Sequence, residues 1–397
     1  MQLLRIATER CKFIMPDLKN KTILQVLPAL NQGGVERGTL DIAEGILKEN
    51  GKALVISAGG KLESYLKKIG AEHIKLPLNS KNPFTILLNI HRLQKVMRER
   101  NVTLVHARSR GPAWSAYYAT KFLKIPFVTT FHGVYNFRSR VKNYYNSVMA
   151  RGERVIAVSQ FIRDHIEKNY RAYVDSKNIK VIYRGVDLHH FALHNVNEKN
   201  CEELKKVWGI DSKTPLILMV GRLARWKGQA ILLEALKEMD DFKGVCVILG
   251  SSQGHENYLK ELQASVNNTP IAHRVKFIEH YSDVPAAYSI ASVVVHASTA
   301  PEAFGRVIAE AQAMGKFVIA SSLGAPKEII EDGKTGVLVS PGNTSELARE
   351  LRAAIKFSQA KQKQISKDAQ KRVQELFSKQ VMIDETLKVY AELLQKK

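Results

Sequence analysis

The sequence predicts an α/β protein made of two successive domains, each with a doubly wound parallel sheet. Three observations predict this fold class. The chain has 397 residues, which is too long for one ordinary hydrophobic core and suits two domains. Short apolar runs alternate with helix-length amphipathic segments, as in βαβ units. The alternation breaks once, over residues 186–214, and then starts again.

The first half contains seven short apolar runs that we expect to be buried strands. Each run is followed by a segment long enough for a helix, which favours parallel strands joined by helical crossovers. The runs are residues 22–30, 53–58, 73–78, 102–107, 126–132, 154–159 and 179–185. They assign residues 1–195 to a first Rossmann-like domain.

The polar segment that follows predicts the connection between the domains. It holds one short helical stretch, and we place the linker at residues 196–214. Six further apolar runs predict a second Rossmann-like domain over residues 215–375. These runs are residues 216–221, 244–250, 274–280, 292–298, 316–321 and 335–340. Residues 376–397 predict a final helix.

The charge is large and unevenly distributed. The net charge is +22; residues 1–200 hold 33 Lys and Arg against 15 Asp and Glu, whereas residues 201–397 hold 27 against 23. Residues 101–150 contain seven basic residues and no acidic one. The first half therefore has a field suited to an anionic partner, such as a membrane surface, nucleic acid or a phosphorylated acceptor. A lysine-rich proteome is the alternative explanation for the overall charge.

The sequence also argues against several classes of protein. Charged residues interrupt the apolar residues of positions 1–21, so we expect no signal peptide. The longest uncharged stretch, residues 284–301, contains two prolines and several serines, so we expect no transmembrane helix. The three cysteines lie far apart without a CxxC pair. This spacing predicts neither a metal site nor a disulfide framework, and it favours a cytoplasmic protein.

The loops after the strands of the first domain are the first place to look for chemistry, because doubly wound sheets bind ligands at the carboxyl ends of their strands. Gly33 and Gly34 follow the first strand. Glycine there permits positive φ and close approach of the backbone to a ligand, although a tight turn explains it equally well. His132 lies just past another strand, where it can meet a substrate; a structural histidine is the alternative.

The second domain opens with a cationic loop. Its first strand ends at Gly221, and Arg222 and Lys227 follow before the next helix. Arginine offers a planar fork for two phosphate oxygens, and lysine adds a compact charge. Two cations on one loop are suited to a diphosphate leaving group, although an exposed basic loop is the alternative.

The segment "PEAFGRVIAEAQAMG", residues 301–315, carries the strongest signal. Pro301 and Gly305 bracket a helix start, so the N–H groups near Phe304, Gly305 and Arg306 are expected to face outward and to accept a phosphate. Glu302 precedes this helix and Glu310 lies within it. Carboxylates accept hydrogen bonds from hydroxyl groups, so the pair can hold the sugar and ribose on either side of a diphosphate. Helix stabilisation alone also explains Glu302.

These motifs together resemble the retaining glycosyltransferases of family 4, which have the GT-B fold. The resemblance covers nearly the whole chain. Its motifs are "NQGGVE", "TFHG", "VIAVSQF", "GVD", "VGRLARWKG", "PEAFGRVIAEAQAMG" and the closing "FSKQVMIDETLKVYAELL", in this order. The resemblance implies two Rossmann-like domains facing across a cleft, with the last helix crossing back to the first domain.

The resemblance also implies roles for residues. Glu302 would contact the donor sugar, Glu310 the nucleotide ribose, and Arg222 and Lys227 the diphosphate. Gly34 would approach the donor from the first domain. His132 would lie near the reacting sugar. We expect a metal-independent reaction with no cofactor, and a UDP-sugar is favoured over a GDP-sugar because such donors are common in the family.

Two features depart from the family pattern. Arg184 stands before "GVD", where the family often has Asn, and residues 1–20 have no recognisable counterpart. The oligomeric state, the sugar and the linkage are not indicated by the sequence.

The basic first domain would then face the acceptor. We expect a glycan or lipid-linked acceptor, in lipopolysaccharide or other cell-envelope synthesis, and a peripheral position on the inner face of the plasma membrane. Residues 82–100 are a basic amphipathic candidate for that contact, although packing against the sheet explains their apolar residues equally well. We expect no binding of nucleic acid, because the strands read as buried on both faces. The alternatives are a sugar-nucleotide epimerase or phosphorylase, and a catalytically silent scaffold.

Overall fold

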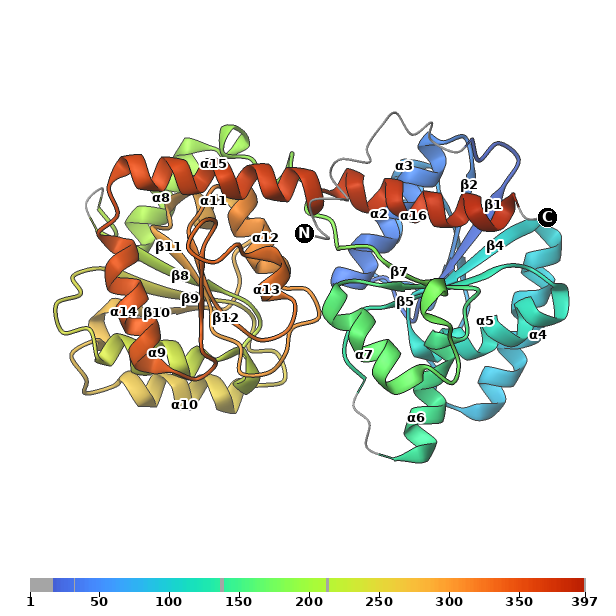
Figure 1. The fold of residues 1–397 in the computed structure, drawn as a ribbon, viewed down its shortest axis with the longest axis horizontal. Helices are drawn as coiled ribbons and strands as arrows, with labels where there is room; N and C mark the ends of the chain where they lie inside the picture. Colours follow the sequence, from blue (N-terminus) through green and yellow to red (C-terminus); the bar gives the residue numbers. More distant parts are fainter. Residues whose placement is uncertain (1–16, 32, 136–138, 212–213, 396–397) are drawn as a thin grey trace. The chain divides into compact units, whose positions relative to one another are not determined.

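Two compact units make up the chain in the computed structural model, which describes residues 17–31, 33–135, 139–211 and 214–395 (Figure 1). The first unit comprises the described residues up to Gly185 together with those from Lys379 onward, and the second is Val186–Ser378. Residues 186–195, which the sequence assigned to the first domain, cluster with the second unit. There the N–H of Val186 donates to the carbonyl of Phe377 at 2.8 Å. Most of the N-terminal segment of unassigned role, residues 1–16, lies outside the described residues.

Thirteen strands form two parallel sheets among the described residues. The first sheet has the order β3-β2-β1-β4-β5-β6-β7 and the second the order β10-β9-β8-β11-β12-β13. The strands are β1 Thr22–Val26, β2 Lys52–Ser57, β3 Glu72–Lys75, β4 Val102–Ala107, β5 Phe127–Phe131, β6 Arg154–Ala157, β7 Ile179–Val181, β8 Leu216–Val220, β9 Val245–Leu249, β10 Val275–Ile278, β11 Val293–His296, β12 Val318–Ser321 and β13 Val337–Val339.

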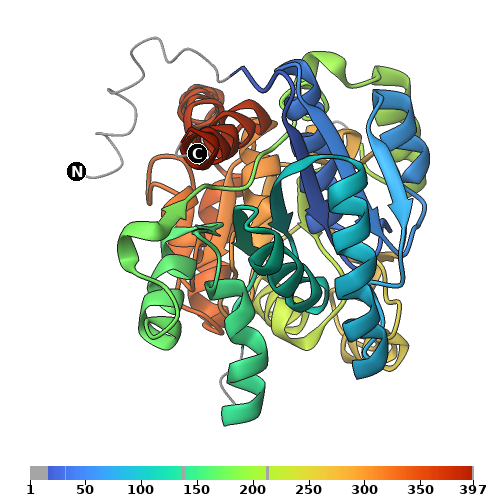
Figure 2. The same cartoon turned by 90° about the vertical axis from the view of Figure 1, so that its right-hand side faces the viewer.

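Helices connect successive strands and cover both faces of each sheet (Figures 1 and 2). They are α2 Gly34–Lys48, α3 Glu63–Ile69, α4 Pro83–Glu99, α5 Arg110–Leu123, α6 Arg140–Asn146, α7 Gln160–Tyr170, α8 Glu198–Trp208, α9 Gln229–Lys237, α10 Glu256–Val266, α11 Val284–Ile290, α12 Arg306–Ala313, α13 Pro326–Ile329, α14 Thr344–Ile355, α15 Gln359–Leu376 and α16 Lys379–Leu394. Short 3₁₀ turns are Ser147–Ala150, Ser176–Asn178, Leu193–Asn195, Arg225–Lys227 and Ala272–Arg274.

Local sequence explains where several helices begin. Asn82 caps α4, accepting a hydrogen bond from the N–H of Phe84, and Pro83 occupies the first helical position, where proline costs nothing. The side chain of Ser159 caps α7 in the same way. Gly305, at φ 95°, precedes α12 without a capping side chain, so the first N–H groups of that helix are left for another acceptor.

The core of the first unit joins the sheet to both α2 and α16. Ile23, Leu104 and Val128 of the sheet pack with Ile42 of α2 and Leu387 of α16. Further along α16, the hydroxyl of Tyr390 lies 2.6 Å from Nδ1 of His106. The C-terminal helix therefore crosses back to the first unit, as the resemblance implies.

The second unit has its own core between its sheet and the helices α9, α10 and α14. Ile217, Val293 and Ile319 from three neighbouring strands share this core with Leu232 of α9 and Leu347 of α14. Each of the thirteen runs predicted from the sequence overlaps one observed strand. The predicted fold class, two Rossmann-like domains of the GT-B type, is confirmed.

No helix among the described residues is both long and apolar enough to cross a bilayer.

Candidate active site

The strand order places two loops side by side in the second unit. In its sheet β8 pairs with β11, with Ile217 opposite Val293, and the order of the strands reverses at this pair. The crevice at such a reversal is where α/β sheets bind ligands. The loop after β8 carries Lys227, and the loop after β11 carries Glu302. These residues are 75 positions apart in sequence and meet here.

Lys227 and Glu302 form a mostly buried ion pair where these two loops meet. The ammonium of Lys227 donates to Oε1 of Glu302, and their side chains are 20% and 13% exposed. Nε2 of His296 lies 3.2 Å from the same oxygen, and the hydroxyl of Ser298 donates to it at 3.3 Å. Burial alone would raise the pKa of Glu302, but the hydrogen bond from His296 and the charge of Lys227 hold it at about 2. Glu302 is therefore an ionised acceptor at neutral pH, suited to hydroxyl groups.

Gly228 allows the lysine loop to lie directly against the end of β11. Its φ is 80°, and a Cβ at this position would fall 1.8 Å from the carbonyl oxygen of Ala297. Next to this contact, the N–H of Thr299 donates to the carbonyl of Trp226 at 2.8 Å. Only glycine satisfies both the left-handed conformation and the backbone contact.

The helix α12 adds a second carboxylate and a start that has no capping side chain among the described residues. Glu310 is 9% exposed and pairs with Arg306 at 2.8 Å, so its burial is compensated by a partner on the same helix. Burial and the neighbouring Glu310 carboxylate raise the pKa of Tyr288, which stays protonated. The side chain of Phe304 is 3% exposed and its ring lies 5.8 Å from that of Phe377. Phe304 therefore anchors the helix start in the core, and only its backbone can reach a ligand.

Arg222 lies in the loop after β8, five positions before Lys227. Its side chain is exposed, and its carbonyl accepts a hydrogen bond from Gln229 at 3.2 Å. Gly221 before it has a φ of 150°, a conformation suited to glycine. The structure thus brings together Lys227, Glu302 and the start of α12, and the side chain of Arg222 in the same loop as Lys227 is exposed to solvent.

A loop that the sequence reading did not single out completes this site. Gly324, in the loop after β12, forms a bridge with Glu302, and the N–H of Ala325 donates to the Glu302 carbonyl at 3.0 Å. At φ 81°, a Cβ on Gly324 would lie 2.6 Å from that carbonyl oxygen. A glycine–alanine–proline sequence at residues 324–326, separated by two residues from a predicted strand, was the available signal.

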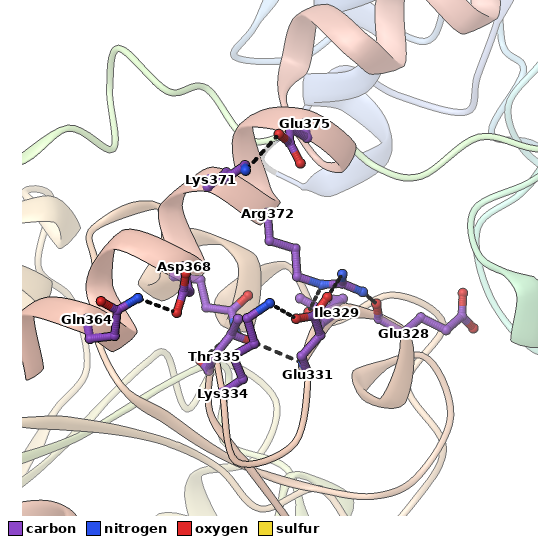
Figure 3. Close-up of polar contacts among 11 residues, drawn as sticks. Glu328, Ile329, Glu331, Lys334, Thr335, Gln364, Asp368, Lys371, Arg372 and Glu375 are labelled. Atoms are coloured by element: carbon purple, nitrogen blue, oxygen red, sulfur yellow. Dashed lines mark hydrogen bonds and ion pairs between the residues drawn. The ribbon is translucent and has the colours of Figure 1, made fainter. Parts of the chain in front are cut away.

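Arg372 of α15 holds this region in place (Figure 3). Its guanidinium donates to the carbonyls of Glu328 and Ile329 at 2.7 Å and pairs with Glu331 at 2.6 Å. It therefore donates hydrogen bonds to carbonyl groups at the C-terminal end of the short helix α13, which have no partner within the helix. Gln312 of α12 donates to the carbonyl of Thr335 at 2.9 Å, so the same framework reaches the helix that carries Glu310.

The glycines after β1 in the first unit do not adopt a left-handed conformation. Gly33 has φ 174°, which is ordinary extended backbone, and Gly34 is not among the residues with positive φ. The positive φ that glycine permits is therefore not used at either position. Instead, a Cβ on Gly34 would lie 2.7 Å from Nη2 of Arg184, which donates to the Gly34 carbonyl. A side chain at position 34 would therefore displace this guanidinium from its present position.

His132 lies after β5 in a buried setting. Both ring nitrogens are buried without a hydrogen-bond partner among the described residues. Burial, together with the charges of Arg184 and Arg108, lowers the pKa of His132 well below its ordinary value. It is therefore a neutral imidazole near pH 7. Arg108, which follows the neighbouring strand β4, was seen in the sequence only as one basic residue among many.

Comparisons with known proteins agree with this geometry. Residues 200–372 match the family described as glycosyl transferases group 1, and residues 32–190 match glycosyltransferase family 4. A crystal structure of a glycosyltransferase from Rickettsia africae is 38% identical, with a TM-score of 0.89, and the match covers 95% of this chain and 100% of that one. Anabaena Alr3699/HepE in complex with UDP-glucose is 26% identical, with a TM-score of 0.80 and coverage of 94% and 99%. Spore coat protein SA of Bacillus subtilis is 26% identical over 310 residues, which are 74% of this chain and 79% of that protein.

Proposed function

The chain belongs to the family 4-type glycosyltransferases of the GT-B fold, and on this basis we propose that it moves a sugar from a nucleotide-diphosphate sugar to a glycan or lipid-linked acceptor with retention of anomeric configuration. The observation that carries the proposal is the convergence of Lys227, Glu302 and the α12 start at the reversal of the second sheet. The process we propose is the synthesis of lipopolysaccharide or another cell-envelope glycan.

The donor is proposed to lie along this crevice with its diphosphate between Lys227, Arg222 and the first N–H groups of α12. Positive groups placed at the departing phosphate stabilise the charge that develops in the transition state. The ionised Glu302 would accept hydrogen bonds from the transferred sugar, and Glu310 from the ribose. The relative HepE was crystallised with UDP-glucose, which supports a UDP-hexose as the donor.

In the proposed reaction the bond between the anomeric carbon and the phosphate oxygen breaks, and its electron pair leaves with the nucleoside diphosphate. An acceptor hydroxyl forms the new bond to the same face of the sugar and loses its proton to the departing phosphate. The cations named above supply the charge that neutralises the leaving group, so we propose that no metal ion is required.

Two other activities are compatible with a donor site of this kind. A sugar-nucleotide epimerase returns the nucleotide with an altered sugar, and a phosphorylase consumes phosphate. A scaffold homologue would bind the nucleotide and turn nothing over. Analysis of products with and without acceptor separates all of these from a transferase.

Thermal unfolding with nucleotides tests the donor site. We expect UDP and UDP-hexoses, but not ADP, to stabilise the protein in the presence of EDTA. At a concentration 100 times the Kd, binding to the native state adds about 2.7 kcal/mol. Glu310→Gln should weaken UDP binding about tenfold because a ribose hydrogen bond to a charged group is lost. Absence of stabilisation by every nucleoside diphosphate, or stabilisation only after Mg²⁺ is added, contradicts the proposal as stated.

The acceptor side is proposed to be bound at a membrane, through an apolar surface on α4 and α5 of the first unit. Phe84, Leu87 and Leu88 are 77%, 59% and 54% exposed and lie on one face of α4 by their spacing. Different residues of α4, such as Leu93 and Met97, are buried against the rest of the first unit. Packing against the sheet therefore does not explain this exposed face.

The neighbouring helix α5 extends the same surface. Phe122 is 68% exposed, and the guanidinium of Arg98 from α4 lies 5.9 Å from its ring centre. Exposed cations such as Lys95 and Lys121 lie along the two helices. Exposed aromatic and aliphatic side chains among cations are typical of an interface with an anionic leaflet, where each cation contributes about 1 kcal/mol.

Vesicle sedimentation tests this surface. We expect the protein to bind vesicles containing phosphatidylglycerol and to leave neutral phosphatidylcholine vesicles unbound. The triple variant Phe84→Ser, Leu88→Ser, Phe122→Ser should reduce binding roughly a hundredfold, because three apolar anchors are lost at about 1 kcal/mol each. Val207→Ser is the matched control, since Val207 is 75% exposed on α8 of the second unit. Equal binding by the triple variant and the control contradicts the membrane surface.

A further inference from the structure

A small cavity in the first unit is lined by two arginines and a histidine. It measures about 20 Å³, and its lining includes Arg108, His132 and Arg184, with Gly38, Thr130 and Thr386. The three side chains follow the strands β4, β5 and β7, so they gather at the carboxyl edge of the sheet. No aspartate or glutamate is found among the described residues that line the cavity.

Arg108 is a buried cation with an unused donor. Its residue is 5% exposed, and its Nε has no hydrogen-bond partner among the described residues. Burial lowers the pKa of this guanidinium, and the nearby Asp41 and Tyr390 oppose that change only in part. A buried charge with an unsatisfied N–H is costly, so an acceptor from outside the chain would be bound favourably here.

The first turns of α2 add to the positive character of the cavity. Arg184 donates to the Gly34 carbonyl, and a Cβ on Gly38 would lie 2.9 Å from Nη2 of Arg108. Both glycines therefore let a guanidinium lie close to the start of the helix. The N-terminus of a helix carries a partial positive charge of its own, so three positive features meet without a lining carboxylate.

His132 adds no negative charge to this cavity. It is neutral near pH 7, as described above, and its ring nitrogens are buried without partners among the described residues. A neutral imidazole can donate one hydrogen bond and accept another, but it brings no negative charge. The cavity thus offers an arginine fork, a second buried arginine and an imidazole to one ligand group.

We propose that Arg108, His132 and Arg184 form a subsite for an oxyanion, a carboxylate or phosphate group carried by one of the two substrates of the transfer. The proposal rests on the proposed function for the identity of those substrates. The cavity holds about one water molecule, so only the leading oxygens of the group enter it while the rest of the substrate stays outside. Arginine binds planar oxyanions through two parallel hydrogen bonds.

Calorimetry with charged and neutral ligands tests the subsite and identifies the source of the anion. In the first arm, UDP-glucuronate is compared with UDP-glucose, which differs from it by one carboxylate. In the second arm, glucose 6-phosphate and glucose are titrated into protein saturated with UDP. We expect the anionic ligand to bind at least tenfold tighter than its neutral partner in one arm. A preference in the first arm assigns the anion to the donor, and a preference in the second assigns it to the acceptor.

Variants of Arg184 show whether the preference arises at this cavity. Arg184→Asn should remove it, a loss of about ten- to hundredfold in affinity for the anionic ligand, while the Kd for UDP stays unchanged. Arg184→Lys keeps the charge without the fork and should retain part of the preference. Arg171→Asn removes an exposed positive charge at the end of α7 and should have no effect.

The proposal is overturned if neither anionic ligand is preferred by the wild type, or if Arg184→Asn and Arg171→Asn behave alike. Failure of the transferase proposal is a different result, because it appears as absence of UDP binding or as absence of sugar transfer to an acceptor in the wild type. In that case titration with inorganic phosphate alone, in wild type and Arg184→Asn, still decides whether the cavity binds an oxyanion.

Discussion

Gly228→Ala is expected to destabilise the second unit by about 4 kcal/mol or more, a loss that only a few kinds of single substitution produce. The new Cβ would lie 1.8 Å from the carbonyl oxygen and 2.6 Å from the carbonyl carbon of Ala297. These are backbone atoms at the end of a central strand, so no side-chain rotation relieves the overlap. The left-handed backbone at φ 80° adds about 1 kcal/mol for any residue with a side chain.

Urea unfolding followed by tryptophan fluorescence measures this loss, because Trp208 is 1% exposed within the second unit and Trp114→Phe removes the signal from the first. The matched control is Gly254→Ala. Gly254 has φ 77°, and a Cβ there would meet nothing within 4 Å, so this variant should lose only about 1 kcal/mol. If both variants lost the same amount, the contact with Ala297 would not be the reason for glycine at position 228.

Lys227→Met is expected to lower sugar transfer about 10² to 10³-fold, the usual effect of removing one group that stabilises developing charge. Methionine has similar length and no ammonium. The rate of UDP release from a UDP-sugar in the presence of acceptor measures the effect. The Kd for UDP shows how much of the lost activity comes from weaker binding of the nucleotide before the reaction. Lys237→Met is the control, because Lys237 pairs with Glu234 on α9 outside the crevice. A rate within threefold of the wild type contradicts a role for Lys227 at the diphosphate.

The same variant changes how stability depends on pH. The pKa of Glu302 is held at about 2, below its ordinary value of 4.5, so its stabilising contribution is complete above pH 4.5 and is lost as the pH falls toward 2. Burial raises the pKa of Glu302, and the ammonium of Lys227 is one of the groups that lower it. In Lys227→Met this group is missing, so the pKa of Glu302 rises. The wild type should therefore exceed Lys227→Met in free energy of unfolding by about 3 kcal/mol at pH 7, and the difference should narrow below pH 4.5. A difference that is constant from pH 7 to pH 3 would contradict this coupling.

The strands were predictable because parallel strands buried on both faces are continuous apolar runs in the sequence. Their ends were less predictable. The first run extends to residue 30, whereas β1 ends at Val26, because Leu27 and Leu30 are fully buried in the loop beyond the strand. The buried segment is therefore longer than the part of it that forms strand hydrogen bonds. An apolar run in the sequence indicates which residues are buried, but it does not indicate where the strand ends.

The loops that carry Lys227 and Glu302 were also predictable, since the carboxyl ends of strands could be read from the sequence. Their direct pairing was not. It depends on β8 lying beside β11, and the sequence does not state which strands are neighbours. The same limit hid the cavity in the first unit, where Arg108 and Arg184 come from strands far apart in sequence. The contact of Gly34 with a guanidinium could not be read from the sequence either, because that guanidinium belongs to residue 184.

The pairing of Val186 with Ser378 has a consequence for how the gene encodes the two units. The second unit is one uninterrupted stretch whose first and last residues are bridged to each other, so in topological terms it is an insertion into the first unit. An insert with adjacent ends can be removed, exchanged or circularly permuted with little loss of closure entropy. The second unit is thus genetically separable, and under the proposed function exchange between relatives would combine one acceptor-binding first unit with different donor-binding second units.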